Sequence, residues 1–155
     1  MKFSTREDIE APIDYVFARA SDFAAYERQA LRRGAQVKRA GGDAAIDVGT
    51  TWNIAFKFRN KDRQMHAELV TLDNPNQIRV DTQTSGIDSI AKVDFVALSP
   101  KRTRLTIGIE LTPKTLSARL LVQSLRLAKS NLSKRFSARV RDFATATEED
   151  YRKVK

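Results

Sequence analysis

The chain has 155 residues, with 28 lysines and arginines against 19 aspartates and glutamates, no cysteine and a single histidine, His66. This composition excludes disulfides, thiolate chemistry and any metal site built from cysteines or from several histidines. The formal net charge of +9 favours anionic partners such as nucleic acid or an acidic membrane surface, but it carries no information about the fold.

The length fits one domain over residues 1–155, with a tail that is expected to fray from about residue 147. The first residues, MKFSTREDIE, carry charges where a signal peptide needs an apolar stretch. No run approaches the roughly 20 apolar residues that span a bilayer. We therefore expect a soluble, cytoplasmic protein.

The N-terminal part of the chain predicts one strand and two short helices. Residues 2–10 alternate between apolar and polar, which is typical of a strand with one wet face. Pro12 suits the first turn of a helix that continues at helical spacing to Ala20. Ser21 or Asp22 caps a second helix, which ends near Gly34.

The middle of the chain predicts six strands, at 35–40, 50–59, 63–73, 77–85, 88–98 and 102–112. Turn-forming residues at 60–62, 73–76 and 99–101 make the connections short, so successive strands are expected to be antiparallel neighbours. We predict an α+β fold whose seven-stranded antiparallel meander is closed by the first strand. Its predicted inner face consists of Phe3, Thr5, Glu7, Ile9, Trp52, Ile54, Phe56, Phe58, Met65, Ala67, Leu69, Ile78, Val80, Thr82, Thr84, Ala91, Val93, Phe95, Leu105, Ile107, Ile109 and Leu111.

From residue 116 onward the pattern predicts one long amphipathic helix that covers this inner face. Its main apolar stripe consists of Leu121, Leu125, Ala128, Leu132, Phe136, Val140 and Phe143. All seven charged residues between Leu116 and Arg141 are positive. A second apolar line, Leu116, Leu120 and Leu127, lies on the opposite side. The two short helices are its simplest cover, with a second subunit or a membrane as the alternatives.

The order of elements and three sequence motifs resemble the START-like (SRPBCC) superfamily of helix-grip proteins, which includes polyketide cyclases and dehydrases and the birch-pollen allergen. The motifs are IEAPIDYVFARASDFAAY at 9–26, GTTWNI at 49–54 and KRTRLTI at 101–107. The chain departs from the family pattern after Tyr26, where Glu27-Arg28-Gln29 follows instead of a proline and a tryptophan. The resemblance implies a cavity between sheet and helix, in a family that mostly binds apolar small molecules.

The expected function is therefore non-covalent binding of an apolar or amphipathic small molecule, such as a lipid, isoprenoid or polyketide-like compound, between sheet and helix. The candidate ligand-binding residues are Glu7, Trp52, Phe56, Met65, Thr82, Thr84, Phe95, Ile107, Leu125 and Leu132. Their aromatic members could equally form plain core.

Glu7 is the one inward carboxylate. Burying it alone would cost several kcal/mol, so it needs a partner, a proton or a wet rim, and Thr5, Thr82, Thr84 and Ser89 are its expected neighbours. His66 and Glu68 share the outer face and are expected to be exposed.

Two alternatives remain open at this stage. A cyclase or dehydrase would need two inward titratable groups beside one cavity, and Glu7 alone qualifies. A basic module could instead dock on an acidic partner, a membrane or RNA, although the aromatic residues that nucleic-acid binding uses do not interleave with the basic ones. We expect no cofactor, no metal site and no nucleic acid. Contact with an anionic membrane is possible, and the oligomeric state is open.

Overall fold

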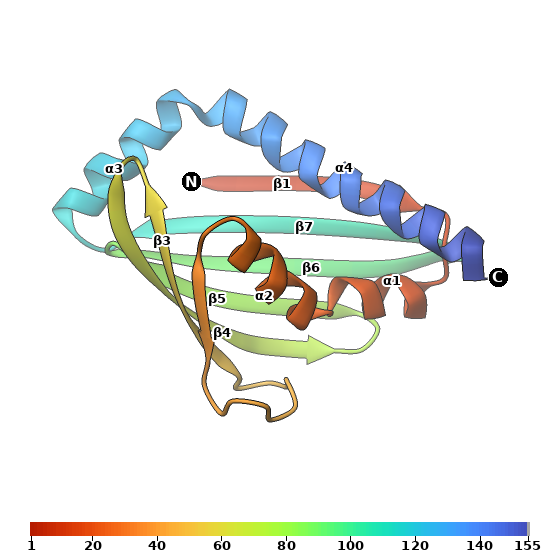
Figure 1. The fold of residues 1–155 in the computed structure, drawn as a ribbon. Helices are drawn as coiled ribbons and strands as arrows, with labels where there is room; N and C mark the ends of the chain where they lie inside the picture. Colours follow the sequence, from red (N-terminus) through yellow and green to blue (C-terminus); the bar gives the residue numbers. More distant parts are fainter. Residues whose placement is uncertain (155) are drawn as a thin grey trace.

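A seven-stranded antiparallel sheet curves around the C-terminal helices in the computed structural model, which describes residues 1–154 (Figure 1). The strands are β1 (Lys2–Ile9), β2 (Gln36–Arg39), β3 (Thr51–Phe58), β4 (Lys61–Asp73), β5 (Gln77–Thr84), β6 (Ile87–Ser99) and β7 (Arg102–Pro113). The helices are α1 (Ile13–Ala20), α2 (Phe23–Arg32), α3 (Leu116–Leu127) and α4 (Lys129–Val154).

The strand order β1-β7-β6-β5-β4-β3-β2 confirms the predicted meander closed by the first strand. Two tight turns set its register. Arg59 and Asn60 have φ of 54° and 60°, and Ser85 and Gly86 have φ of 51° and 75°. Positive φ at both central residues gives the turns that match strand twist. The β3–β4 turn therefore lies one residue earlier than the predicted 60–62.

Gly86 also fixes where α3 begins. A Cβ at this position would lie 2.6 Å from the Thr115 hydroxyl, so only glycine fits. Thr115 is the N-cap of α3, and its hydroxyl accepts a hydrogen bond of 3.1 Å from the Ala118 amide. The β5–β6 turn thus seats the first turn of α3 at one end of the sheet.

The predicted single long helix is in fact two helices, separated at Ala128. The Ala128 amide bonds back to the Leu125 carbonyl at 3.0 Å, which tightens and ends α3. No proline or glycine lies at the break. Each segment instead buries its own residues against a different part of the sheet, Ala118 and Val122 from α3, and Val140, Ala144 and Thr147 from α4.

The hydrophobic core has two parts. The larger joins α1 and α4 to the sheet through Val16, Phe17, Leu69, Phe95, Leu105 and Val140, among others. The smaller joins α3 to the start of β6 through Ile87, Ala118 and Val122. Thr147 is fully buried and α4 continues to Val154, so the described part of the tail is helical where fraying was expected.

Candidate functional site

Cross-strand pairing confirms the predicted inner face. Ile54 pairs with Met65, Met65 with Thr84, and Val93 with Ile107, so these side chains point to the side of the helices. Most of the inner face between the two cores is only half-buried. Because these side chains keep part of their surface exposed to solvent, the helices do not fill the space over this face.

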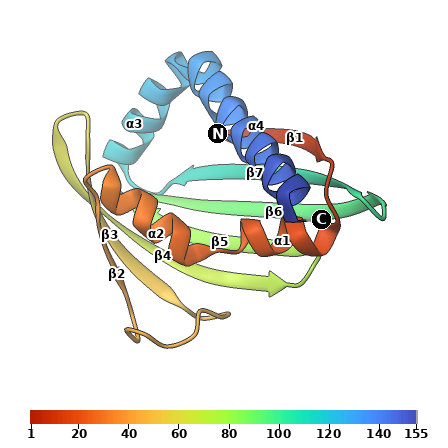
Figure 2. The same ribbon diagram turned by 45° about the vertical axis from the view of Figure 1, so that its right-hand side comes forward.

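That space includes a cavity of about 540 Å³ between α4, the sheet and the two short helices. In Figure 2, α1, α2 and α4 all lie over the same face of the sheet, and the C-terminal end of α4 lies beside α1. The apolar lining is contributed by Val93, Leu105, Ile107, Phe136, Val140 and Phe143. The volume falls within the range of small-molecule pockets, and the pocket faces the C-terminal helix as expected, but it is open to solvent and not internal.

The rim of this cavity is polar and basic. Arg19, Arg33 and Arg139 border it, together with Tyr26 and Gln29. Arg19 forms an ion pair with Asp150. Within residues 1–154, Arg33 and Arg139 have no carboxylate partner within salt-bridge distance. Two guanidinium groups beside an apolar cavity are suited to an anionic group on an otherwise apolar molecule.

Tyr26 is the uncharged titratable residue of this rim. It is 40% exposed, and its hydroxyl donates a 2.8 Å hydrogen bond to the Ala20 carbonyl. Desolvation of the phenol, with a smaller effect of the Asp22 charge, raises the pKa of Tyr26 to about 12. The phenol is therefore protonated at neutral pH. The residues that line the cavity include neither a carboxylate nor a histidine.

Glu7 finds its partner on α4. Its Oε1 lies 3.5 Å from the Nε of Arg141. Of its predicted neighbours, Thr5 is on the same strand, but Thr82 and Thr84 are distant because β7 and β6 separate β1 from β5. Thr82 instead pairs with Ser89 through their hydroxyls, and the Thr84 hydroxyl donates to the Gln64 carbonyl at 2.7 Å. Glu7 therefore connects β1 to α4 and has the partner it was expected to need, but Thr82, Thr84 and Ser89 do not surround it.

The other predicted site residues divide into three groups. Ile107 lines the cavity. Trp52 and Phe95 are buried in the larger core, where Trp52 packs on Phe23 and Phe95 packs on Phe17. Phe56, Met65, Thr82, Thr84, Leu125 and Leu132 are half-buried and are not part of the cavity lining. The structure thus does not bring the predicted set together in one place.

The cavity residues that sequence reasoning missed come mostly from the helices. The sequence indicated Tyr26 only as part of a family motif, and no sequence pattern indicated that Arg33 or Arg139 borders a binding site. Val93 and Leu105 were assigned to the inner face by alternation, and Phe136, Val140 and Phe143 to the helix stripe. Their meeting depends on where α4 crosses the sheet, which a linear pattern does not contain.

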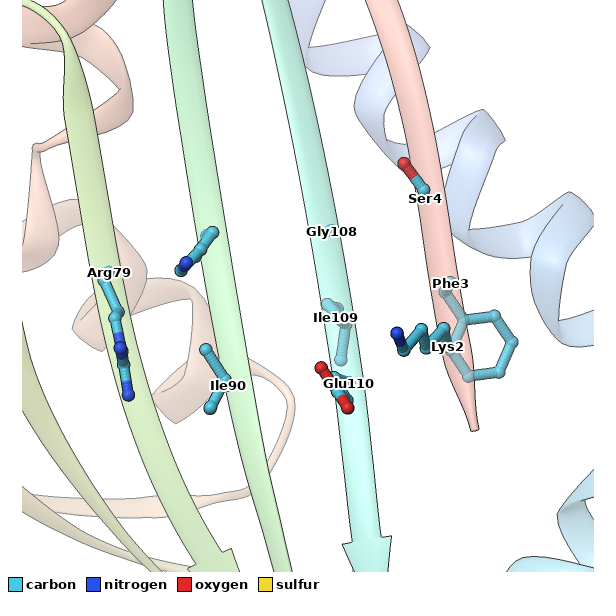
Figure 3. Close-up of a pocket in the computed structure, with 9 residues that line it drawn as sticks. Lys2, Phe3, Ser4, Arg79, Ile90, Gly108, Ile109 and Glu110 are labelled. Carbon is cyan, nitrogen blue, oxygen red and sulfur yellow. The ribbon is translucent and has the colours of Figure 1, made fainter.

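A second hollow, of about 260 Å³, lies on the outer face of the sheet (Figure 3). It forms over Gly108, which pairs with Ser4 on one side and Lys92 on the other. Charged side chains including Arg79 and Glu110 border it. Arg79 is already paired with Asp81 at 2.8 Å. This hollow faces away from the helices.

The remaining sequence candidates stay on the surface. His66 is exposed, as expected, and its Nδ1 lies 3.1 Å from the Asn53 side-chain oxygen. No group of three or more acidic or histidine residues with the geometry of a metal site occurs within residues 1–154. None of the helices in that range is both long enough and apolar enough to cross a membrane.

The curved sheet, the long C-terminal helix and the ligand-sized cavity between them together define a helix-grip protein. Residues 1–148 match the family described as "Polyketide cyclase / dehydrase and lipid transport". Because the match spans nearly the whole chain, the protein belongs to this family. The START-like resemblance that the motifs indicated is confirmed.

Solved structures of the same fold support this placement. Norcoclaurine synthase from Thalictrum flavum, a point mutant in complex with a transition state analogue, is 13% identical with a TM-score of 0.66, over 97% of this chain and 95% of that chain. The Zhui aromatase/cyclase from a Streptomyces species is 12% identical, with a TM-score of 0.64, over 100% of this chain and 96% of that chain. A protein from Thermus thermophilus is 12% identical, with a TM-score of 0.63, over 95% of this chain and 97% of that chain. No curated protein sequence matches significantly. At these identities the likeness concerns the fold.

Proposed function

We propose that the protein binds an amphipathic small molecule non-covalently, with its apolar body in the cavity between α4 and β6–β7 and an anionic group near Arg33 and Arg139. The observation that carries the proposal is the 540 Å³ cavity, whose apolar floor and basic rim match such a molecule. Burial of the apolar body supplies the affinity, and the rim orients the molecule.

Membership of a family described by cyclase, dehydrase and lipid transport activities supports either binding or catalysis. The lining favours binding. Acid–base chemistry needs positioned groups that exchange protons near neutral pH, whereas the rim offers a high-pKa phenol and three guanidinium groups. Glu7 lies on the inner face but is paired with Arg141. A lipid, isoprenoid or polyketide-like ligand that is carried unchanged fits this arrangement best.

A fluorescent long-chain fatty acid, cis-parinaric acid, tests the proposal by direct titration. Val93→Trp places a large side chain in the cavity and is expected to weaken binding at least roughly tenfold. Val96→Trp is the matched control, because Val96 is exposed on the outer face of the same strand. It should bind like the wild type.

The rim is tested with the methyl ester of the same acid. The wild type should prefer the acid, and Arg33→Gln combined with Arg139→Gln should remove most of that preference while leaving ester binding intact. Failure of the wild type to bind either probe, or equal binding by the Val93→Trp variant, would refute the cavity as the site.

A further inference from the structure

Three leucines of α3 are exposed to an extent that burial in the protein does not explain. Leu116, Leu120 and Leu127 are 74%, 60% and 92% exposed. The short helices α1 and α2 were their expected cover, and this expectation is wrong. The opposite side of α3 makes the packing contact, where Ala118 and Val122 are 1% and 2% exposed. An apolar line that faces water at a helix surface marks a surface that something else covers.

The geometry of α3 makes the line continuous. Residues 116, 120 and 127 are spaced by four and seven, so they lie along one face of the helix over roughly 16 Å. Arg119 and Arg126, themselves seven apart, border this face on one side. Figures 1 and 2 both show α3 at the edge of the molecule, far from the C-terminal end of α4. The face is therefore free to meet a flat partner.

The charge around the leucines decides between two partners. All charged residues from Leu116 to Arg141 are positive, and Arg119 and Arg126 are exposed beside the leucine face. In a symmetric dimer formed through α3, these cations would lie next to their own copies and repel. Three leucines also supply only a small part of the ~800 Å² that each partner buries in a stable interface. An anionic lipid surface is complementary to both the leucines and the cations.

We propose that α3 is a membrane-docking helix, whose leucine face inserts at the surface of an anionic bilayer while Arg119 and Arg126 contact lipid head groups. A helix with an apolar line and bordering cations lies in the interface plane in this way. The inference rests on the exposure of α3 and not on the cavity. It holds or fails separately from the proposed function.

Sedimentation with vesicles of phosphatidylcholine, with and without phosphatidylglycerol, tests the proposal on the full-length protein. The wild type should bind the anionic vesicles at low salt and bind less at high salt. Leu120→Ser combined with Leu127→Ser should lower the partition coefficient by roughly a hundredfold, about tenfold for each leucine. Leu98→Ser is the matched control, since Leu98 is an exposed leucine on β6.

The cations are tested in the same assay. Arg119→Gln combined with Arg126→Gln should weaken binding roughly fivefold for each charge. Arg152→Gln, in the last turn of α4, removes a charge far from the leucines and should have little effect. All of these positions are exposed, so the variants should keep the wild-type circular dichroism spectrum and thermal midpoint.

A gain-of-signal variant avoids reliance on loss alone. Leu127→Trp adds a water-exposed indole, whereas Trp52 is buried beneath α2 and gives a constant background. Anionic vesicles should shift its emission to the blue, and brominated lipids should quench it. Three results would overturn the proposal. In the first, the wild type does not bind anionic vesicles. In the second, the leucine variant binds them as well as the wild type does. In the third, the protein is a dimer in solution and the leucine substitutions dissociate it.

Discussion

Removing the side chain of Glu27 should destabilise the protein by about 3 kcal/mol. Glu27 lies on α2, and its carboxylate accepts 2.8 Å from the Trp52 indole and 3.2 Å from an Arg39 Nη. The Arg39 Nε lies 3.0 Å away, and the two charged side chains are 23% and 17% exposed. One acidic residue thus attaches α2 to both β2 and β3. This is the position where the sequence departs from its family pattern.

The magnitude follows from what Glu27→Ala leaves behind. A buried indole N–H without an acceptor costs roughly 1–3 kcal/mol, and breaking a fully buried ion pair costs about 3–5 kcal/mol. Because water reaches both charged side chains, loss of the ion pair costs well below that figure, and the total is about 3 kcal/mol. Urea denaturation gives the free energy of unfolding, and the thermal midpoint should fall by about 10 °C.

Two controls isolate the interaction. Glu27→Gln keeps an acceptor for Trp52 but removes the charge, so it should cost about half as much. Arg28→Ala changes an exposed neighbour on the same helix and should stay within about 0.5 kcal/mol. If Glu27→Ala costs no more than Arg28→Ala, the carboxylate does not anchor α2 and the reasoning fails.

Leu132 belongs to the predicted apolar stripe of the C-terminal helix, but it is half-buried and belongs to neither core cluster, so Leu132→Ala should cost less than about 1.5 kcal/mol. Val140→Ala should cost more, about 2 kcal/mol, and equal urea midpoints for the two variants would contradict this order. Asp8 accepts hydrogen bonds from Arg104 at 2.8 and 3.2 Å, which holds the pKa of Asp8 below its usual 3.8. The interaction with Arg104 stabilises the protein fully at pH values above the pKa that Asp8 has in the unfolded chain. This stabilisation is lost as the pH falls through the lower pKa that Asp8 has in the folded protein. The stability difference between wild type and Asp8→Asn should therefore shrink on acidification, whereas Asp43→Asn, in an exposed loop, should show no such trend.

Much of the sheet could be predicted because its signals are local. Alternation with period two assigned inner and outer faces, and short turn segments ordered the strands, so the meander closed by β1 followed from neighbouring residues alone. The turn at Arg59 and Asn60 was misplaced by one residue. Arginine gives no warning that it will adopt a positive φ, which the register of the two strands requires at this position.

The rest was decided by contacts between residues distant in the chain. Helical periodicity continues through Ala128, yet α3 and α4 pack on different parts of the sheet and the helix divides there. Glu7 and Glu27 find Arg141, Arg39 and Trp52 only once α2 and α4 are in place. The cavity rim joins Arg33 to Arg139, and the leucines of α3 remain uncovered. A sequence pattern tells which side of an element is apolar, but only the tertiary structure decides whether that side meets a core, a cavity or water.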